Sequence, residues 1–134
     1  MKGIDYSPVS VEKSKKVNEA AIAEDRCAVL QGSVADMIFA DDWFDAVTAF
    51  ETVYFWPDLP QCFREVYRVL KPGGTLLICN ESNGDTDKDE KWTEIIGGMT
   101  IYKDMELKAY LEQAGFHDVQ IHKQKSWLCI TARK

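Results

Sequence analysis

An aspartate at position 5 stands where a carboxylate could bind a sugar. The residues Lys2-Gly3-Ile4 predict a short strand, and Ser7 and Pro8 are a typical N-cap and first residue of a helix. At the carboxyl end of a strand in an α/β fold, an acid accepts hydrogen bonds from ribose hydroxyls. The alternative is a solvated acid stabilised by the helix N-terminus. The position of Asp5 favours the ribose role.

A second candidate position follows the apolar run Phe44–Phe50, which predicts a central strand of a parallel sheet. Phe50 and Glu51 lie at its carboxyl end, where open α/β sheets bind their ligands. We therefore expect both residues to border a ligand. The alternative for Glu51 is a helix-capping or solvated carboxylate.

Histidines and cysteines give no metal or catalytic signal. Neither His117 nor His122 stands at ligand spacing from a cysteine or an acid, and neither is a convincing base. The four cysteines form no C-x-x-C pair and have apolar neighbours: Cys27, Cys62, Cys79 and Cys129. We expect buried, reduced thiols in a cytoplasmic protein, with no metal site, rather than disulfides.

The clearest element that positions these residues is a helix after Asp58, which is a good N-cap with Gln61 three residues further on. Apolar side chains repeat at helical spacing and define one buried face: Leu59, Cys62, Phe63, Val66, Tyr67 and Leu70. The run Lys71-Pro72-Gly73-Gly74 ends the helix, and Thr75–Cys79 predicts another buried strand.

The remaining pattern alternates strands and helices until a terminal hairpin. Further expected elements are a helix over Pro8–Glu24, a strand over Cys27–Leu30, a surface loop over Ser82–Lys91, a helix over Asp104–Ala114, and strands over Val119–Lys123 and Trp127–Ala132. The joint before Trp127 is so short that the last two strands must be antiparallel. We expect one α/β domain over residues 1–134, with a mainly parallel sheet and one reversed strand.

Charge and hydrophobicity argue against nucleic-acid binding and against a membrane-spanning segment. The 134-residue chain has a net charge of −6, which disfavours binding to nucleic-acid phosphates. No apolar run approaches the roughly 20 residues that cross a membrane. The first residues also lack the apolar stretch of a signal peptide.

With these elements in place, the chain resembles the class I S-adenosylmethionine-dependent methyltransferases that act on small molecules. The resemblance rests on the order and spacing of five segments: Gly3–Ser7, Gly32–Val34, Phe50–Asp58, Glu65–Gly74 and Ala114–Phe116. Glu65–Gly74 is the most specific, because this run before a buried strand is very common in the family. The family's sheet is Rossmann-like and ends with a strand inserted antiparallel.

The resemblance implies S-adenosylmethionine as cofactor and a small-molecule acceptor. It assigns cofactor binding to Asp5, Tyr6, Ser33, Val34 and Phe50, and acceptor binding to Glu51, Tyr54, Trp92 and Tyr102. Ser33 and Val34 would contact the adenine, although the family most often has an aspartate at the Ser33 position. For Val34 and Ser33 the alternative is a simple turn, and for the three aromatic acceptor candidates it is packing on the core. No catalytic residue is assigned.

The family's first strand and its Gly-x-Gly loop have no counterpart before Gly3, so we expect the N-terminal βα unit to be missing. If that loop supplies half of the binding free energy of a micromolar cofactor, the dissociation constant of this chain rises to about millimolar. Unpaired sheet edges would also favour a homo-oligomer. Two alternatives remain: a non-catalytic α/β module that assembles with another chain, and a different nucleotide binder such as an NAD-dependent dehydrogenase. The turn at Lys71–Gly74 and the terminal hairpin argue against the dehydrogenase.

Overall fold

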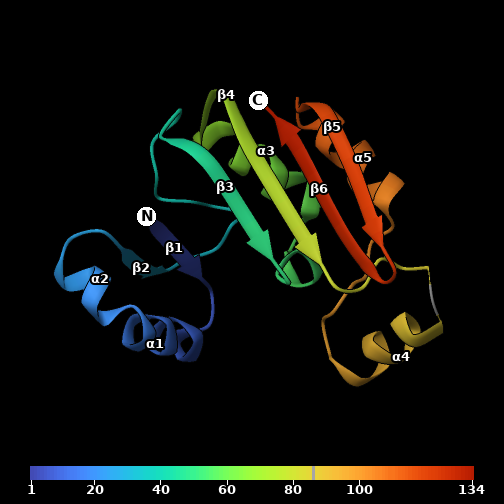
Figure 1. The fold of residues 1–134 in the computed structure, drawn as a ribbon, viewed down its shortest axis with the longest axis horizontal. Coiled ribbons are helices and arrows are strands. Elements are labelled where there is room, and N and C mark those ends of the chain that lie inside the picture. Colours follow the sequence, from blue (N-terminus) through green and yellow to red (C-terminus); the bar gives the residue numbers. More distant parts are fainter. Residues whose placement is uncertain (86) are drawn as a thin grey trace. The chain divides into compact units, whose positions relative to one another are not determined.

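A computed structural model describes residues 1–85 and 87–134. The chain divides into two compact units, Met1–Ile38 and Phe39–Lys134. Figure 1 shows the helices and strands of each unit. The single domain expected over the whole chain stays a prediction. No helix among the described residues is long and apolar enough to cross a membrane.

The first unit is built on two parallel strands, β1 (Lys2–Asp5) and β2 (Ala28–Gln31). Helices α1 (Pro8–Val17) and α2 (Glu19–Ala23) connect them. Ser7 caps α1, because its Oγ accepts a hydrogen bond from the Ser10 amide at 3.3 Å. The parallel pairing brings the carboxyl ends of β1 and β2 side by side.

The single helix expected over Pro8–Glu24 is wrong, because the helix breaks at Asn18. The backbone there leaves the helical region, with φ −103° and ψ 17°. The Asn18 Nδ2 donates a hydrogen bond to the Ser14 carbonyl at 2.8 Å. Asparagine side chains compete with the helical ladder in this way, which ends α1 and begins α2.

The second unit holds a four-stranded sheet in the order β3-β4-β6-β5. Its strands are β3 (Phe44–Phe50), β4 (Leu70–Asn80), β5 (His117–Gln124) and β6 (Trp127–Arg133). Strands β3 and β4 are parallel, whereas β6 runs antiparallel to both β4 and β5. The expected α/β sheet with a reversed terminal strand is therefore confirmed.

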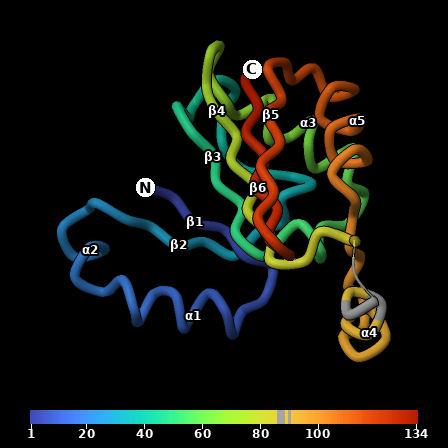
Figure 2. Tube along the Cα trace, turned by 45° about the vertical axis from the view of Figure 1, so that its right-hand side comes forward, coloured from blue at the N-terminus to red at the C-terminus, as the bar shows by residue number. Residues whose placement is uncertain are grey.

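Helices α3 (Leu59–Val69) and α5 (Asp104–Gln113) lie on one face of this sheet, as Figures 1 and 2 both show. The expected cap is present, since Asp58 Oδ1 accepts from the Gln61 amide at 3.2 Å. The largest fully buried side chains between helices and sheet are Phe63, Leu70, Leu76, Ile78, Leu107, Leu111, Leu128 and Ile130. The four-stranded sheet and its two helices thus form the core of the second unit.

The first residues of β4 require glycine. A Cβ atom on Gly74 would lie 2.8 Å from the Lys71 carbonyl oxygen, and Gly73 has φ +78°. The helix ends at Val69, and β4 begins at once, earlier than the Thr75 expected. These glycines lie between the Phe44–Leu70 and Ala46–Thr75 pairs of β3 and β4, where the register shifts. Beyond the shift, Phe50 at the end of β3 is paired with Cys79 near the end of β4.

The surface loop expected over Ser82–Lys91 is wrong over most of its length. Helix α4 covers Asp87–Ile95, and Ser82 and Asn83 are buried. Polar residues are buried where internal hydrogen bonds satisfy them, as is the case for both. Thr86 lies outside the described residues.

Candidate functional site

Asp5 keeps one carboxylate oxygen open at the carboxyl end of β1. Its Oδ1 accepts from the Ser7 amide at 2.8 Å, and its carbonyl accepts from the Gly32 amide at 3.0 Å. Among the described residues, Asp5 Oδ2 has no hydrogen-bond partner. The Ser7 contact holds the side chain in place and leaves Oδ2 as an acceptor for a ligand.

The turn after β2 lies beside Asp5 because β1 and β2 are paired. Ser33 Oγ accepts from the Ala35 amide at 3.2 Å, so the Ser33 hydroxyl hydrogen remains able to donate. The next residue, Val34, is half-buried. Gln31 Nε2 donates a hydrogen bond to the Tyr6 carbonyl at 3.2 Å, and the Tyr6 side chain is 68% exposed. These segments bring Asp5, Tyr6 and Ser33 together at one end of the first unit.

In the second unit, Phe50 and Glu51 lie at the carboxyl end of β3. Phe50 is 57% exposed. Glu51 has φ +56°, a left-handed conformation that is uncommon for a residue with a side chain. Its amide donates to the Cys79 carbonyl at 3.0 Å, and its Oε1 accepts from the Glu81 amide. These contacts fix Glu51 against the end of β4.

The carboxyl group of Glu51 is shifted toward its protonated form. Partial desolvation raises the pKa of Glu51 above its ordinary value, although the hydrogen bond from the Glu81 amide opposes this. Strained backbone and a raised acid pKa together are typical of functional positions. Glu51 is thus the titratable group in this unit best suited to a ligand.

Tyr54 follows in the short 3₁₀ helix η1 (Val53–Phe55) and is only 3% exposed. Its hydroxyl donates to the Ser82 carbonyl at 3.2 Å and accepts from the Ser82 amide at 2.8 Å. Burial raises the pKa of Tyr54 to about 12. The hydroxyl is committed to Ser82, so Tyr54 has the surroundings of a core residue.

The two other aromatic candidates differ in their connection to Tyr54. The Thr100 amide donates to the Tyr54 carbonyl at 2.9 Å, which places Tyr102 near this segment. Tyr102 is half-buried and packs edge-on against Tyr110, with ring centroids 6.5 Å apart. Trp92 belongs to α4 and is 49% exposed.

Asn80 is a feature of this region that the sequence pattern did not reveal. Asn80 is 1% exposed, and its Oδ1 has no hydrogen-bond partner among the described residues. The only sequence signal was a polar residue directly after the apolar run of β4. A buried orphan acceptor at the carboxyl end of a parallel strand marks Asn80 as a further candidate for the site.

The expectation that all four cysteines are buried is wrong for two of them. All four are free, and Cys27 and Cys62 are buried as expected. Cys79 and Cys129 are half-buried, and their sulfurs are 2.8 Å apart. Both point to the sheet face opposite the buried Leu76 and Ile78, because side chains alternate along a strand.

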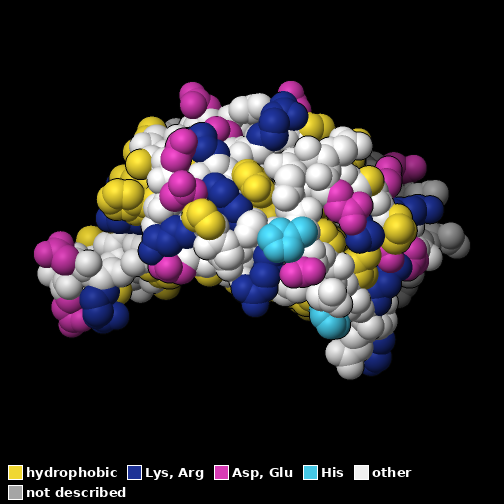
Figure 3. Space-filling model, turned by 90° about the horizontal axis from the view of Figure 1, so that it is seen from above, with side chains coloured by type: hydrophobic (Ala, Val, Ile, Leu, Met, Phe, Trp, Pro, Cys, Tyr) yellow, Lys and Arg dark blue, Asp and Glu magenta, His cyan; other side chains and the backbone are white. Residues whose placement is uncertain are grey.

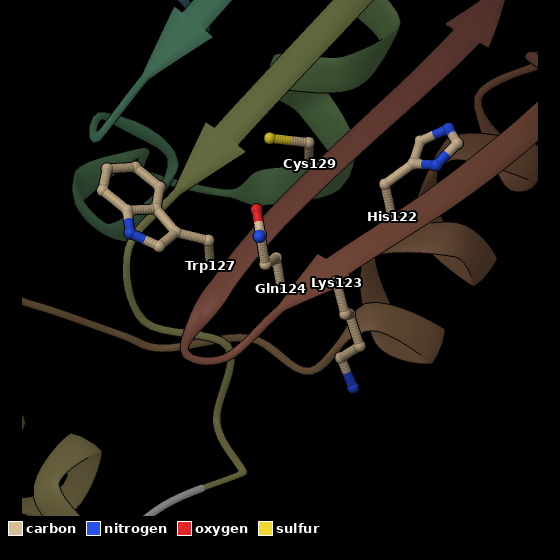
Figure 4. Close-up of a pocket in the computed structure, with 5 residues that line it drawn as sticks. All are labelled: His122, Lys123, Gln124, Trp127 and Cys129. Carbon is tan, nitrogen blue, oxygen red and sulfur yellow. The ribbon is translucent and has the colours of Figure 1, made fainter.

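A pocket lies at the hairpin end of the four-stranded sheet. Figure 4 shows its lining residues: His122, Lys123, Gln124, Trp127 and Cys129. Within residues 1–85 and 87–134, no cluster of three His, Cys, Asp or Glu side chains could hold a metal ion. On the face that Figure 3 shows, acidic and basic side chains are interspersed rather than gathered by sign.

Comparison with known proteins identifies a family. The model of the methyltransferase domain matches residues 1–78. Cycloartenol-C-24-methyltransferase 1 from Oryza sativa subsp. japonica is 35% identical over 76 residues, which are 57% of this chain and 22% of the relative. The chloroplastic 2-methyl-6-phytyl-1,4-hydroquinone methyltransferase 1 of the same plant is 27% identical over 118 residues, which are 88% of this chain and 34% of the relative. The chain spans about a fifth to a third of the length of these relatives.

Solved structures share the fold. One is a Haloferax volcanii complex of the Trm112 methyltransferase activator with a protein described as a methyltransferase, with TM-score 0.84 and 23% identity over 98% of this chain and 70% of that one. Another is the [4+2]-cyclase SpnF, with TM-score 0.80 and 19% identity over 99% of this chain and 65% of that one. At these identities the likeness establishes the Rossmann-like fold and leaves the reaction open.

Proposed function

The chain belongs to the methyltransferase-domain family of class I S-adenosylmethionine-dependent enzymes, and from this we propose that it takes part in methyl transfer to a small-molecule acceptor. The observation that carries the proposal is the open Asp5 Oδ2 at the carboxyl end of a parallel strand pair. Relatives named as methyltransferases of cycloartenol and of 2-methyl-6-phytyl-1,4-hydroquinone support a small acceptor.

The residues of the first unit fit the nucleoside part of the cofactor. Asp5 Oδ2 would accept from a ribose hydroxyl in a charge-assisted hydrogen bond. Ser33 already accepts from the Ala35 amide, so its hydroxyl would best donate to an adenine ring nitrogen. The cofactor supplies a methyl group that its sulfonium already activates. The main contribution of these side chains is therefore to position the donor.

The acceptor candidates lie in the second unit, which also holds the cofactor candidate Phe50. Phe50 offers an exposed apolar surface to the cofactor, and Glu51 offers a fixed carboxylate to the acceptor. The raised pKa of Glu51 suits a base, which is needed only if the acceptor carries a proton where methyl is added. Tyr102 and Trp92 are the further acceptor candidates, whereas Tyr54 would act by holding Ser82 in place.

A titration with S-adenosylmethionine tests the cofactor site. We expect NMR shifts that saturate at millimolar ligand and centre on Asp5, Gly32 and Ser33. Asp5→Ala should weaken binding by about 1.5–3 kcal/mol, because a hydrogen bond to a charged group is lost. Glu12→Ala is the matched control, since Glu12 is exposed on α1 and carries the same charge. Equal affinities of the two variants would contradict the proposal.

A second candidate is a module that works only in assembly with another chain. Among the described residues, β1 pairs only with β2, and β3 only with β4, so each strand leaves one edge of its backbone unpaired. Such edges favour a homo-oligomer, and we propose association through them. Because all four cysteines are free, we also propose that the protein works in the reducing cytoplasm.

One assay separates the two candidates. The chain is incubated with S-adenosylmethionine labelled in the methyl group and with candidate sterol, quinol and sugar acceptors. Transfer of label supports the enzyme, and Glu51→Gln should reduce it if the acceptor must lose a proton. Saturable cofactor binding without label transfer to any acceptor would favour the module.

A further inference from the structure

Two free cysteines face each other across neighbouring strands of the four-stranded sheet. Cys79 on β4 is the direct register partner of Cys129 on antiparallel β6, and their sulfurs lie 2.8 Å apart in hydrogen-bond contact. Both side chains are half-buried. Two thiols in contact on adjacent backbones need little movement of either strand to become linked.

The two sulfurs have different surroundings. Cys129 lines the pocket with His122 and Trp127, and Figure 4 shows its side chain directed toward β4. Small molecules can therefore approach Cys129 from the pocket. Both cysteines lie on central strands: Cys79 is between Cys129 and Phe50 on β3, and Cys129 is between Cys79 and His122 on β5. Only Cys129 lines the pocket.

The contact also affects the reactivity of Cys79. Either thiol can donate in the contact between the two sulfurs, and this hydrogen bond raises the pKa of Cys79 to about 11. The thiolate is the reactive form of cysteine, so the raised pKa makes Cys79 a slow first nucleophile. Because Cys129 lines the pocket and Cys79 does not, Cys129 is the thiol that a small oxidant reaches first.

We propose that Cys79 and Cys129 form a reversible disulfide on exposure to a low-molecular-weight disulfide such as oxidised glutathione. The Cys129 thiolate attacks one sulfur of the oxidant, and a glutathione thiolate leaves. Cys79 then attacks the Cys129 sulfur of the mixed disulfide and releases the second glutathione. The two protons of the protein thiols pass to the two leaving thiolates, and the protein loses two electrons.

The proposed bond would link β4 to β6 beside the candidate acceptor residues. The Glu51 amide donates to the Cys79 carbonyl at 3.0 Å, so a change at Cys79 reaches Glu51 directly. The inference does not rest on the proposed function, because it depends only on two thiols and their register.

The chain carries matched control cysteines. Cys62 is fully buried, its Sγ donates to the Pro57 carbonyl at 2.7 Å, and burial raises its pKa to about 11. Cys27 is 5% exposed. Neither has another cysteine as a hydrogen-bond partner among the described residues.

The test uses the reduced, folded chain in glutathione buffers of increasing oxidised fraction, quenched by thiol alkylation. We expect intact mass and peptide mapping to show an intramolecular bond between Cys79 and Cys129, reversed by dithiothreitol. Cys79→Ser should trap a glutathione adduct on Cys129. Cys129→Ser should leave Cys79 largely unmodified, and Cys62→Ser should behave as the parent chain.

Three results would overturn the proposal. The first is no Cys79–Cys129 bond even in fully oxidised glutathione. The second is bonds between chains instead of within one chain. The third is that Cys62→Ser also fails to form the Cys79–Cys129 bond, which would show that the contact between the two sulfurs does not determine the reaction. Thermal unfolding of all variants in reducing buffer checks that each is folded before oxidation.

Discussion

At the scale of single residues, Tyr54 shows how one side chain ties two segments together. Its hydroxyl bonds both the amide and the carbonyl of Ser82. Tyr54→Phe leaves two buried backbone groups without this partner and should cost about 1–3 kcal/mol of unfolding free energy. Urea denaturation measures the loss. Tyr6→Phe is the control, because Tyr6 is 68% exposed and its removal should change little.

Burial of the Tyr54 phenol also makes the stability of the fold depend on pH. Its pKa is raised from 10.0 to about 12 by burial, so the folded state holds the phenol proton more tightly than the unfolded state. The stabilisation is complete below pH 10 and is lost as pH rises through about 12. Tyr54→Phe should flatten this part of the curve. An unchanged alkaline slope would show that other groups cause it.

The position of Asp5 in the fold could be predicted from the sequence, whereas other features of the candidate site were missed for a physical reason. Asp5 could be predicted because a strand end and a helix start lie next to each other in the chain. Asn80 and the pair of Cys79 with Cys129 could not, because burial and cross-strand register depend on residues far away in sequence. Whether Asp5 binds a ribose stays a prediction.

At the scale of elements, helix α3 begins at an N-cap residue with a strained backbone. Asp58 caps the helix but has φ +32°, in the left-handed region. Asp58→Ala loses the cap and keeps the strain, and should cost about 1–2 kcal/mol. Asp58→Gly loses the cap but relieves the strain, and should cost only a few tenths of a kcal/mol. Chemical denaturation compares the two variants, and an equal loss would mean that backbone strain plays no part.

Element type was predictable wherever the apolar pattern was strong. Strand β3 has the expected bounds, and α3 and the terminal hairpin were confirmed. The failures fall on polar segments: α1 breaks at Asn18, and α4 forms within an acidic stretch. In such segments local side-chain bonds and distant contacts decide the structure, and periodicity carries little information.

At the scale of the molecule, the four-stranded sheet has two edges of different character. Edge strand β5 carries His117, His122 and Lys123 and has a register shift, which are features that discourage strand addition. Edge strand β3 has a single charge, Asp45, which is paired with Lys71 at 2.8 Å. The β3 edge is thus the one open to pairing with another chain.

This asymmetry gives a direct test of self-association. We expect sedimentation equilibrium at micromolar concentration to show a dimer. Thr48→Lys places a charge on exposed β3 and should weaken the dimer by about 0.5–2 kcal/mol, because a symmetric contact carries the change twice. Gln120→Lys adds the same charge on the exposed surface of β5 and should have no effect. A monomeric parent chain, or equal weakening by both variants, would remove the β3 edge as the interface and leave its unpaired backbone groups to solvent.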